Sequence, residues 1–260
     1  MDIPPQVLTW LFSWLLLMPR AIGLFVLLSF ASRTILPGMA RNALMVSITI
    51  VLIPIMIDQQ VMVPTDWSDL LLLILKEVFI GLILGFIFST PFWIMDSVGA
   101  IIDRQRGSMS GSIKSPLLES ESTILGNFLS IYTVALLFAS GGFHYLLKTF
   151  FESYIKWPIM TFYPDVRIEI SFYFLSLLDS LMYSVVLIAG PVLIVIFLVD
   201  LGFGFLNRSV PQINVFILSL PVKGLASILI LTLYITKISE YLRILFSEYG
   251  LSFQGLEDIL

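Results

Sequence analysis

The residues of this chain with the most evident chemistry are charged side chains that stand inside long apolar stretches. They are Arg20, Lys76, Glu77, Asp96, Asp179, Asp200, Arg208 and Lys223. An ionised group in hydrocarbon is costly unless another protein group pairs with it. We therefore expect the cations Arg20, Arg208 and Lys223 to contact counter-charges. Asp179 and Asp200 are the candidates on chemical grounds. Arg20 either lies buried against protein or extends toward the membrane surface, and its cost in lipid favours burial.

Catalytic residue types are scarce. The chain has no cysteine and a single histidine, His144. This composition excludes a thiolate nucleophile and a cysteine-ligated metal. A histidine-based triad or metal site is not expected, and His144 is better explained as filler of a core or an interface. None of the HExxH, GxSxG or P-loop patterns occurs. We therefore expect no enzyme activity, no cofactor and no metal.

The composition predicts the elements that must position these charges. The 260 residues are 58% hydrophobic and 12% charged, and the mean hydropathy is +1.00. Soluble domains carry roughly 25% charged residues. The chain is therefore expected to be an all-α polytopic membrane protein of a single domain, residues 1–260. The net charge of −4 is spread along the sequence and does not favour nucleic-acid binding.

About six apolar segments approach or exceed the length that crosses a bilayer. They cover Val7–Ala31, Asn42–Ile57, Leu70–Ser89, Thr123–Ser140, Phe172–Val199 and Gly224–Thr236. Proline removes a backbone donor and disfavours helix before it. Pro91 is therefore expected to break the helix of the third segment just after Ser89, and Pro221 to interrupt the apolar run that leads into the last. Gly190-Pro191 is expected to make the fifth a kinked helix or two half-helices. Asp58–Asp69 is expected to be an acidic connector, and Asp103–Ser122 a polar loop.

The third segment has a smooth face. Gly81, Gly85 and Ser89 stand four residues apart, which allows another helix to approach closely. A chance match in a glycine-rich chain is the alternative explanation. Lys76 and Glu77 precede this face and, being adjacent, are expected to point to different sides of the helix.

The stretch Asn207–Lys223, NRSVPQINVFILSLPVK, is unsuited to a simple lipid-facing anchor. It contains two prolines, two cations and polar Asn214. Backbone groups that proline frees in hydrocarbon must be satisfied by protein or by trapped water. The stretch is therefore expected to pack against other protein.

The same stretch resembles the C-terminal signature of the SctT/FliR family, the export-apparatus subunit of bacterial type III secretion systems and flagella. The matching residues are Arg208, Pro211, Gln212, Asn214, Phe216, Pro221 and Lys223. A second match at Pro91–Gly107, PFWIMDSVGAIIDRQRG, is similar to the injectisome branch, SctT. Weaker matches are Arg20, Arg41, Glu77 with Gly81 and Gly85, and Gly141-Gly142.

This resemblance implies a non-enzymatic subunit of the export gate in the bacterial inner membrane, multi-pass and extending to the periplasmic side. It implies an SctR-like portion over about residues 1–200 and an SctS-like helical hairpin with an amphipathic tail over about residues 201–260. The implied partners are SctR-like, SctS-like and SctU-like subunits, membrane lipid, and unfolded secreted proteins that pass through the assembly.

The resemblance also implies roles for particular residues. Subunit packing is expected from Arg20, Gly81, Gly85, Arg208, Pro211, Gln212, Asn214, Phe216, Pro221 and Lys223. A gate loop is expected from Gly107, Ser108, Met109, Ser110, Gly111 and Ser112. For this loop, an ordinary cytoplasmic connection whose cations only set the topology is the alternative.

A second function stays open. Discontinuous helices and isolated carboxylates are typical of ion-coupled secondary transporters, for which Asp179 and Asp200 would be the ion-coupling residues. No internal repeat with matching broken segments supports this alternative.

Overall fold

The computed structural model describes residues 5–28, 37–58, 67–107, 113–114, 121–161, 169–209 and 214–255. The helices are α1 (Pro5–Leu27), α2 (Gly38–Asp58), α3 (Trp67–Gln105), α4 (Ile124–Ala139), α5 (Gly142–Lys156), α6 (Glu169–Ser209) and α7 (Val215–Gly255). A short antiparallel pair, β1 (Ile113–Lys114) and β2 (Glu121–Ser122), is the described exception to helix. The expected all-α class is confirmed.

The chain forms two compact units, which are described separately. The first contains Met1–Ser89, Phe143–Tyr173 and Ser247–Leu260. The second contains Thr90–Gly142 and Phe174–Phe246. The helix α3 therefore contributes its first half to one unit and its second half to the other.

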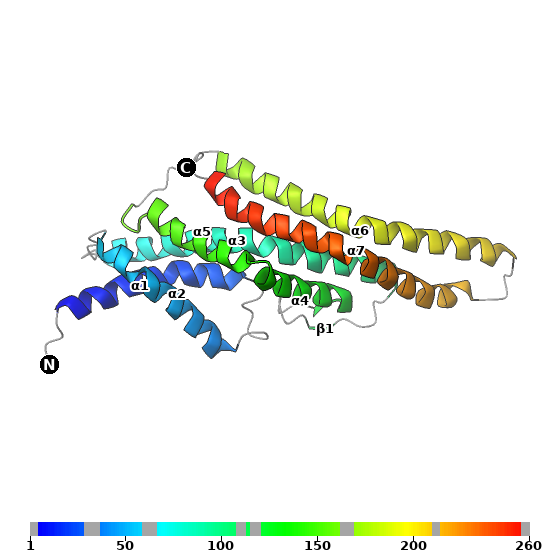
Figure 1. Cartoon of the computed structure of the whole chain (residues 1–260), viewed down its shortest axis with the longest axis horizontal. Coiled ribbons are helices and arrows are strands. Elements are labelled where there is room, and N and C mark those ends of the chain that lie inside the picture. The colour runs from blue at the N-terminus through cyan, green and yellow to red at the C-terminus, as the bar shows by residue number, and fades with distance from the viewer. Residues whose placement is uncertain are drawn as a thin grey trace. The chain divides into compact units, whose positions relative to one another are not determined.

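In the first unit, α1 packs on α2 and on the first half of α3. Figure 1 shows α1 in dark blue beside α2 in lighter blue. The indole of Trp14 donates to the hydroxyl of Thr49 at 3.1 Å, which ties α1 to α2. Apolar side chains from these helices and from α5 make the core: Leu16, Leu17, Leu24, Leu52, Leu73, Leu84, Phe150 and Tyr154. Apolar burial thus holds four helices together, and α5 is distant from the other three in the sequence.

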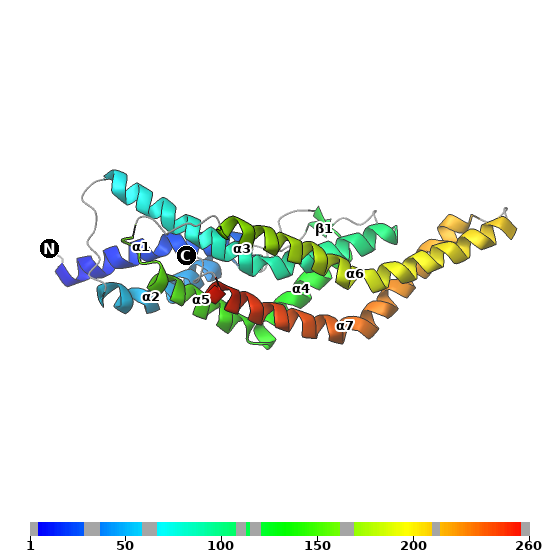
Figure 2. The same ribbon diagram turned by 90° about the horizontal axis from the view of Figure 1, so that it is seen from above.

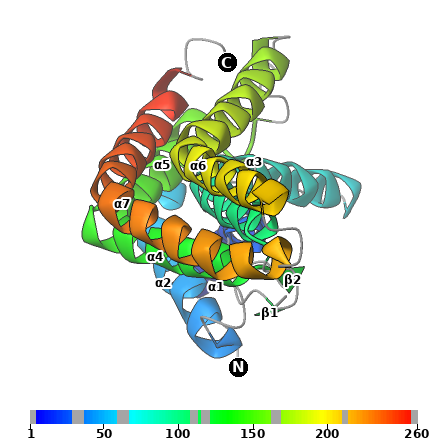
Figure 3. The ribbon, with the colours of Figure 1, turned by 90° about the vertical axis from the view of Figure 1, so that its right-hand side faces the viewer.

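In the second unit, α6 and α7 run side by side as an antiparallel hairpin, drawn in yellow and orange in Figures 2 and 3. The hydroxyls of Ser184 and Tyr241 are 2.7 Å apart and join the two helices. The hydroxyl of Tyr132 on α4 reaches that of Ser239 on α7. Hydroxyl contacts of this kind satisfy polar groups between apolar helices without exposing them to lipid.

The second half of α3 packs against the start of α4. Gly99 lies directly against the backbone of Gly126, with no space for a side chain at either position. One turn further along α3, the carboxylate of Asp103 accepts a hydrogen bond from the backbone N–H of Leu125 at 2.8 Å. Thr123 caps α4 through its side chain, which accepts from the N–H of Gly126. The N–H groups of Leu125 and Gly126 at this helix end are therefore satisfied by side chains.

The expected breaks at Pro91 and Pro221 are wrong, and so is the expectation of two half-helices at Gly190-Pro191, where the alternative of a kinked helix stays a prediction. Pro91, Pro191 and Pro221 lie inside the continuous helices α3, α6 and α7. In a membrane helix, neighbouring helices and hydroxyl side chains can satisfy the carbonyl that proline frees, so proline does not have to end the helix. The polar connectors are also shorter than expected, because α3 begins at Trp67 and continues to Gln105.

Within the described residues, three helices are long and apolar enough to cross a membrane: α3 over Trp67–Gln105, α6 over Phe172–Ser209 and α7 over Ile217–Glu248. The pair α4 and α5 makes a fourth if it counts as one span, with a bend of 73° between its halves. The apolar parts of α1 and α2, Phe12–Leu27 and Gly38–Pro54, are shorter. The chain is therefore a polytopic membrane protein whose helices differ greatly in length.

Candidate functional site

Arg20 on α1 is a fully buried charged group of the first unit. Its side chain is wholly inaccessible, and so is that of Glu77 on α3. Nε of Arg20 donates to Oε2 of Glu77 at 2.7 Å, and its NH2 group donates to Oε1 at 3.1 Å. This is the bidentate geometry in which an arginine–carboxylate pair is strongest. The expected burial of Arg20 is confirmed, but its counter-charge is Glu77 and not Asp179 or Asp200.

The remaining donors of Arg20 reach the end of α5. NH1 donates to Oγ of Ser153 at 3.0 Å, and NH2 donates to the backbone carbonyl of Trp157 at 2.9 Å. The guanidinium carbon also lies 4.0 Å from the ring centroid of Tyr154. The hydroxyl of Tyr154 in turn donates to the carbonyl of Leu17 on α1 at 2.8 Å. One arginine thus binds α1, α3 and α5 together.

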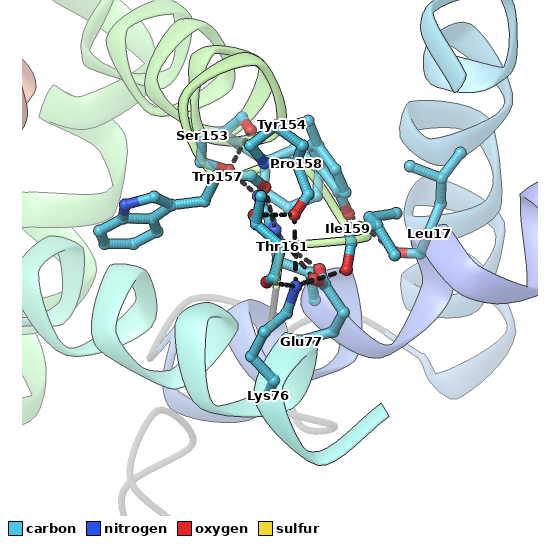
Figure 4. A network of polar contacts seen from close by, with 11 residues as sticks. Leu17, Lys76, Glu77, Ser153, Tyr154, Trp157, Pro158, Ile159 and Thr161 are labelled. Carbon is cyan, nitrogen blue, oxygen red and sulfur yellow. Dashed lines mark hydrogen bonds and ion pairs between the residues drawn. The ribbon is translucent and has the colours of Figure 1, made fainter. Parts of the chain in front are cut away.

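Lys76 completes this network, as Figure 4 shows. Its ammonium group lies 2.9 Å from Oε1 of Glu77. It also donates to the backbone carbonyls of Pro158, Ile159 and Thr161 at 3.3, 2.7 and 3.0 Å. The expectation that Lys76 and Glu77 point to different sides of α3 is wrong, because the flexible lysine stem curls back to the carboxylate. A cation that caps the carbonyls after α5 is favourable at a helix C-terminus.

Glycines bring α1 and α3 close enough for this pairing. A side chain at Gly81 would collide with the backbone carbonyl of Arg20, and one at Gly23 with the carbonyl of Val78. Gly85 faces the carbonyl of Leu24, and Oγ of Ser89 donates to that of Leu27 at 2.5 Å. The expected smooth face is confirmed, and the helix that it contacts is α1 of the same chain.

The buried network around Arg20 and Glu77 is suited to holding helices together and not to catalysis. Neither Arg20 nor Glu77 has any exposed side-chain surface, so a substrate could not reach the ion pair. In the part of the chain that the structure describes, no three His, Cys, Asp or Glu side chains are grouped so that they could hold a metal. A buried, fully paired cluster of this kind fixes which helices meet and where along their length they meet.

A second charge pair lies in the hairpin of the second unit. The ammonium of Lys223 on α7 contacts Oδ1 of Asp200 on α6, and the lysine is nearly buried while the aspartate is 36% exposed. Asp200 is therefore confirmed as a counter-charge. Asp179, the other candidate, has an exposed side chain on α6. A pocket of about 390 Å³ lies beside the pair, lined by Asp200, Phe203, Gly204, Asn207, Asn214, Val215 and Ser219.

The remaining residues that the sequence predicts for subunit packing and for the gate loop are not joined in a buried charge pair where the structure describes them. Arg208, Asn214 and Pro221 are exposed, and Oδ1 of Asn214 accepts from the N–H of Ile217 at 3.5 Å. Gly107 forms the turn after α3 with a positive φ of 80°. Pro211, Gln212 and Ser108–Ser112 lie outside the described residues, as does the side chain of Phe216.

Sequence reasoning missed the contribution of α5 to the buried network. Ser153 and the backbone carbonyls of Trp157, Pro158, Ile159 and Thr161 are its partners. Tyr154 of the same helix is 2% exposed and lies against the guanidinium of Arg20. The available signal was Pro158 directly after the helix, because the carbonyls at a helix end lack intrahelical partners and accept hydrogen bonds from other groups.

Comparison of the sequence with known proteins shows the family of this chain. The sequence matches the family described as bacterial export proteins, family 1, over residues 11–249. It is 33% identical over 225 residues to the Yop proteins translocation protein T of Yersinia pestis, with 86% of each chain covered. It is 32% identical over 238 residues to the secretion system apparatus protein SsaT of Salmonella typhimurium, with 89% of each covered. The flagellar biosynthetic protein FliR of Bacillus subtilis is 32% identical over 180 residues, 68% of this chain and 69% of that protein.

Proposed function

This chain belongs to family 1 of the bacterial export proteins, and from this premise we propose that it is a structural and gating subunit of a type III secretion export gate. Its relatives include translocation and secretion-apparatus proteins. The chain is accordingly a type III secretion export-apparatus subunit. The observation that carries the proposal is the match over residues 11–249, which includes both charge pairs and all three long helices.

We place this subunit in the bacterial inner membrane, extending to the periplasmic side, in a complex with SctR-like, SctS-like and SctU-like subunits. Helix length supports this placement. A helix of 39 to 41 residues is roughly 60 Å long, about twice the thickness of the hydrocarbon core. Large apolar side chains such as Phe79 on α3, Phe205 on α6 and Leu233 on α7 are exposed on these helices, which gives them surface to pack against other protein. Unfolded secreted proteins would pass through the resulting assembly.

The exposed signature residues are the proposed contacts to these partners. Arg208, Asn214 and Pro221 are exposed near the tip of the α6–α7 hairpin. An exposed arginine and a helix-capping asparagine on an apolar hairpin are suited to hydrogen bonding with a neighbouring subunit. Arg20, Gly81 and Gly85 act indirectly in this proposal, because they shape the surface of the first unit. Lys223 does the same for the hairpin.

The segment Gly107–Ser112 is the proposed gate loop. It follows α3 at the turn of Gly107, whose backbone is in the left-handed region. The short β1–β2 pair lies in the same connection between α3 and α4. Shortening the connection between Gly107 and Ser122 is expected to let small ions leak through assembled complexes.

The transporter alternative has less support. Of its two carboxylates, Asp200 is already bound to Lys223, which leaves it no free charge for an ion. Asp179 is exposed, and among the described residues it belongs to no group of three His, Cys, Asp or Glu side chains that could hold a metal ion.

Purification of the tagged chain from its native host in mild detergent tests the proposal. Mass spectrometry of the co-migrating proteins should find small SctR-like and SctS-like membrane proteins in a stable complex. A lone monomer or homodimer would contradict it, and ion-coupled uptake by reconstituted vesicles would then become the next measurement.

A further inference from the structure

Asp96 is a half-buried carboxylate in the second half of α3. Of the described acidic side chains that are not exposed, four contact a cation of this chain: Glu77, Asp103, Glu152 and Asp200. Asp96 is the fifth, and its Oδ1 has no exposed surface and no hydrogen-bond partner among the described residues. An ionised group in an apolar helix needs a counter-charge. Asp96 therefore needs a cation that the described part of the chain does not supply.

Asp96 lies where α3 meets α4. The contacts run in opposite directions along the two helices, because Asp103 meets Leu125 and Gly99 meets Gly126. Oδ1 of Asp96 is 2.9 Å from the position that a Cβ atom of Gly126 would occupy, and the backbone carbonyl of Asp96 is equally close to it. The carboxylate thus lies beside the turn of α4 that contains Gly126.

Two more unpartnered oxygens belong to this part of α4. Oδ1 of Asn127 and Oγ of Ser130 have no exposed surface and no hydrogen-bond partner among the described residues, and Ser130 as a whole is 1% exposed. With about 100° and 1.5 Å per residue, counted from the Gly99–Gly126 contact of an antiparallel pair, all three side chains lie on the same side of the interface. Along the helix axis, Asp96 then lies between Asn127 and Ser130.

The N-terminus of α4 does not supply donors for these oxygens. The N–H of Leu125 donates to Asp103 at 2.8 Å. Thr123 accepts from the N–H of Gly126 through its hydroxyl at 3.2 Å, and from that of Asn127 through its carbonyl at 2.9 Å. The alternative that the unpaired carboxylate of α3 caps this helix therefore has no N–H group of these three residues to support it.

We propose that Asp96, Asn127 and Ser130 bind one small monovalent metal cation, such as Na⁺, between α3 and α4. Their unpartnered atoms are all oxygens, which hard cations prefer. One carboxylate balances a single positive charge, and the few oxygens present are too few for Ca²⁺, which takes six to eight. A basic side chain of a neighbouring subunit is less suited, because none of the three atoms has surface that it could reach.

Such a site differs in kind from the groups of three His, Cys, Asp or Glu side chains that the described residues lack. Its ligands are one carboxylate, one amide and one hydroxyl, with the backbone carbonyl of Asp96 as a further oxygen. The bound ion would neutralise Asp96 inside the apolar helix and join α3 to α4. The inference does not depend on the proposed gating function.

Equilibrium binding of radioactive Na⁺ to the full chain, purified in mild detergent, tests the site. The parent should bind one ion per chain. Asp96→Asn keeps the shape and removes the charge, so the affinity for Na⁺ should fall about tenfold or more, whereas Ser130→Ala should lower it about fivefold. Two variants are matched controls that should bind Na⁺ like the parent. Asp179→Asn changes an exposed aspartate of α6, and Ser140→Ala removes another unpartnered hydroxyl, at the far end of α4.

Thermal unfolding of the same preparations gives a second measurement, which needs no variant. An ion that binds only the folded chain stabilises it. Sodium chloride should therefore raise the unfolding temperature of the parent more than choline chloride does at equal ionic strength. In Asp96→Asn the two salts should act alike. If Asp96→Asn does not fold, the parent and Ser130→Ala decide the question.

Equal effects of the two salts on the parent would overturn the site, and so would unchanged Na⁺ binding in Asp96→Asn. A third result would also overturn it: a parent that binds no Na⁺, together with an Asp96→Asn variant that loses a partner subunit during co-purification. The carboxylate would then belong to a cation of that subunit. None of these results contradicts the export-gate proposal, which the co-migrating subunits of the parent test separately.

Discussion

Arg20 and Glu77 stand 57 residues apart in the sequence and form a two-point ion pair with no exposed side-chain surface. Removing one partner of such a pair leaves an uncompensated charge away from water, whereas replacing both with apolar groups avoids that penalty. The pair therefore specifies how α1 meets α3 more than it adds to total stability.

Arg20→Ala is expected to lower the free energy of unfolding by roughly 3–5 kcal/mol, because Glu77 would stay buried and lose its arginine. The double variant Arg20→Met/Glu77→Leu should be less destabilised than either single variant. Thermal unfolding of the detergent-purified chain measures both effects. Lys148→Ala is the control, since its pair with Glu152 is half exposed and worth at most about 1 kcal/mol. A double variant less stable than both singles would contradict this account.

Gly81→Ala should destabilise the first unit by roughly 1–3 kcal/mol, because the added methyl group would meet the main-chain carbonyl of Arg20, which cannot move aside alone. Gly202→Ala is the matched control. It also lies inside a long helix but faces open space, so alanine there should be neutral or stabilising by about 0.5–1 kcal/mol. The yield of folded protein and the unfolding temperature distinguish the two. Equal behaviour of both variants would show that α1 and α3 do not need this close approach.

Asp200→Asn should destabilise the α6–α7 hairpin by about 1–3 kcal/mol, less than a fully buried pair would because the carboxylate is partly exposed. Lys223→Met in the same chain should restore most of the loss. Asp179→Asn, at an exposed position of the same helix, should have little effect. The rate at which a protease cleaves the hairpin in membranes measures these changes in stability. If both aspartate variants instead fold normally and abolish ion uptake, the result would support the transporter alternative.

Arg208→Ala and Pro211→Ala should reduce assembly with partner subunits before they reduce the amount of this chain in the membrane. Arg208 is exposed at the end of α6, where a lost hydrogen bond would affect a neighbour and not the fold. Quantitative co-purification against total membrane protein gives the comparison. Lys237→Ala is the control, because its pair with Glu240 is mostly solvent-exposed. Normal complex yield in both test variants would refute their packing role.

The helical class and the membrane assignment could be predicted from the sequence because both depend on composition and segment length. The spacing of Lys148 and Glu152, four residues apart, favours one polar face on the helix α5, and the two side chains form an ion pair there. The buried partner of Arg20 was not predictable. Choosing Glu77 over Asp179 or Asp200 requires knowing which helices touch, and that depends on backbone contacts at Gly23 and Gly81.

The prolines show a case in which a local sequence rule predicts a break that the structure does not have. In water, a proline inside a helix leaves a carbonyl that the solvent can bind, and the helix usually ends there. Pro91, Pro191 and Pro221 are each followed by further helix. The local rule was overridden because a membrane helix that stops in hydrocarbon would expose more unsatisfied groups than one that continues.

One residue of α1 is held by α3 in two ways at once. Gly81 presses on the main-chain carbonyl of Arg20, while Glu77, one turn earlier, binds its guanidinium. Sliding α1 by one turn, about 5.4 Å, would break the ion pair. Turning α1 about its own axis would do the same. Any conformational change in this unit therefore moves α1 and the first half of α3 together, as one rigid body.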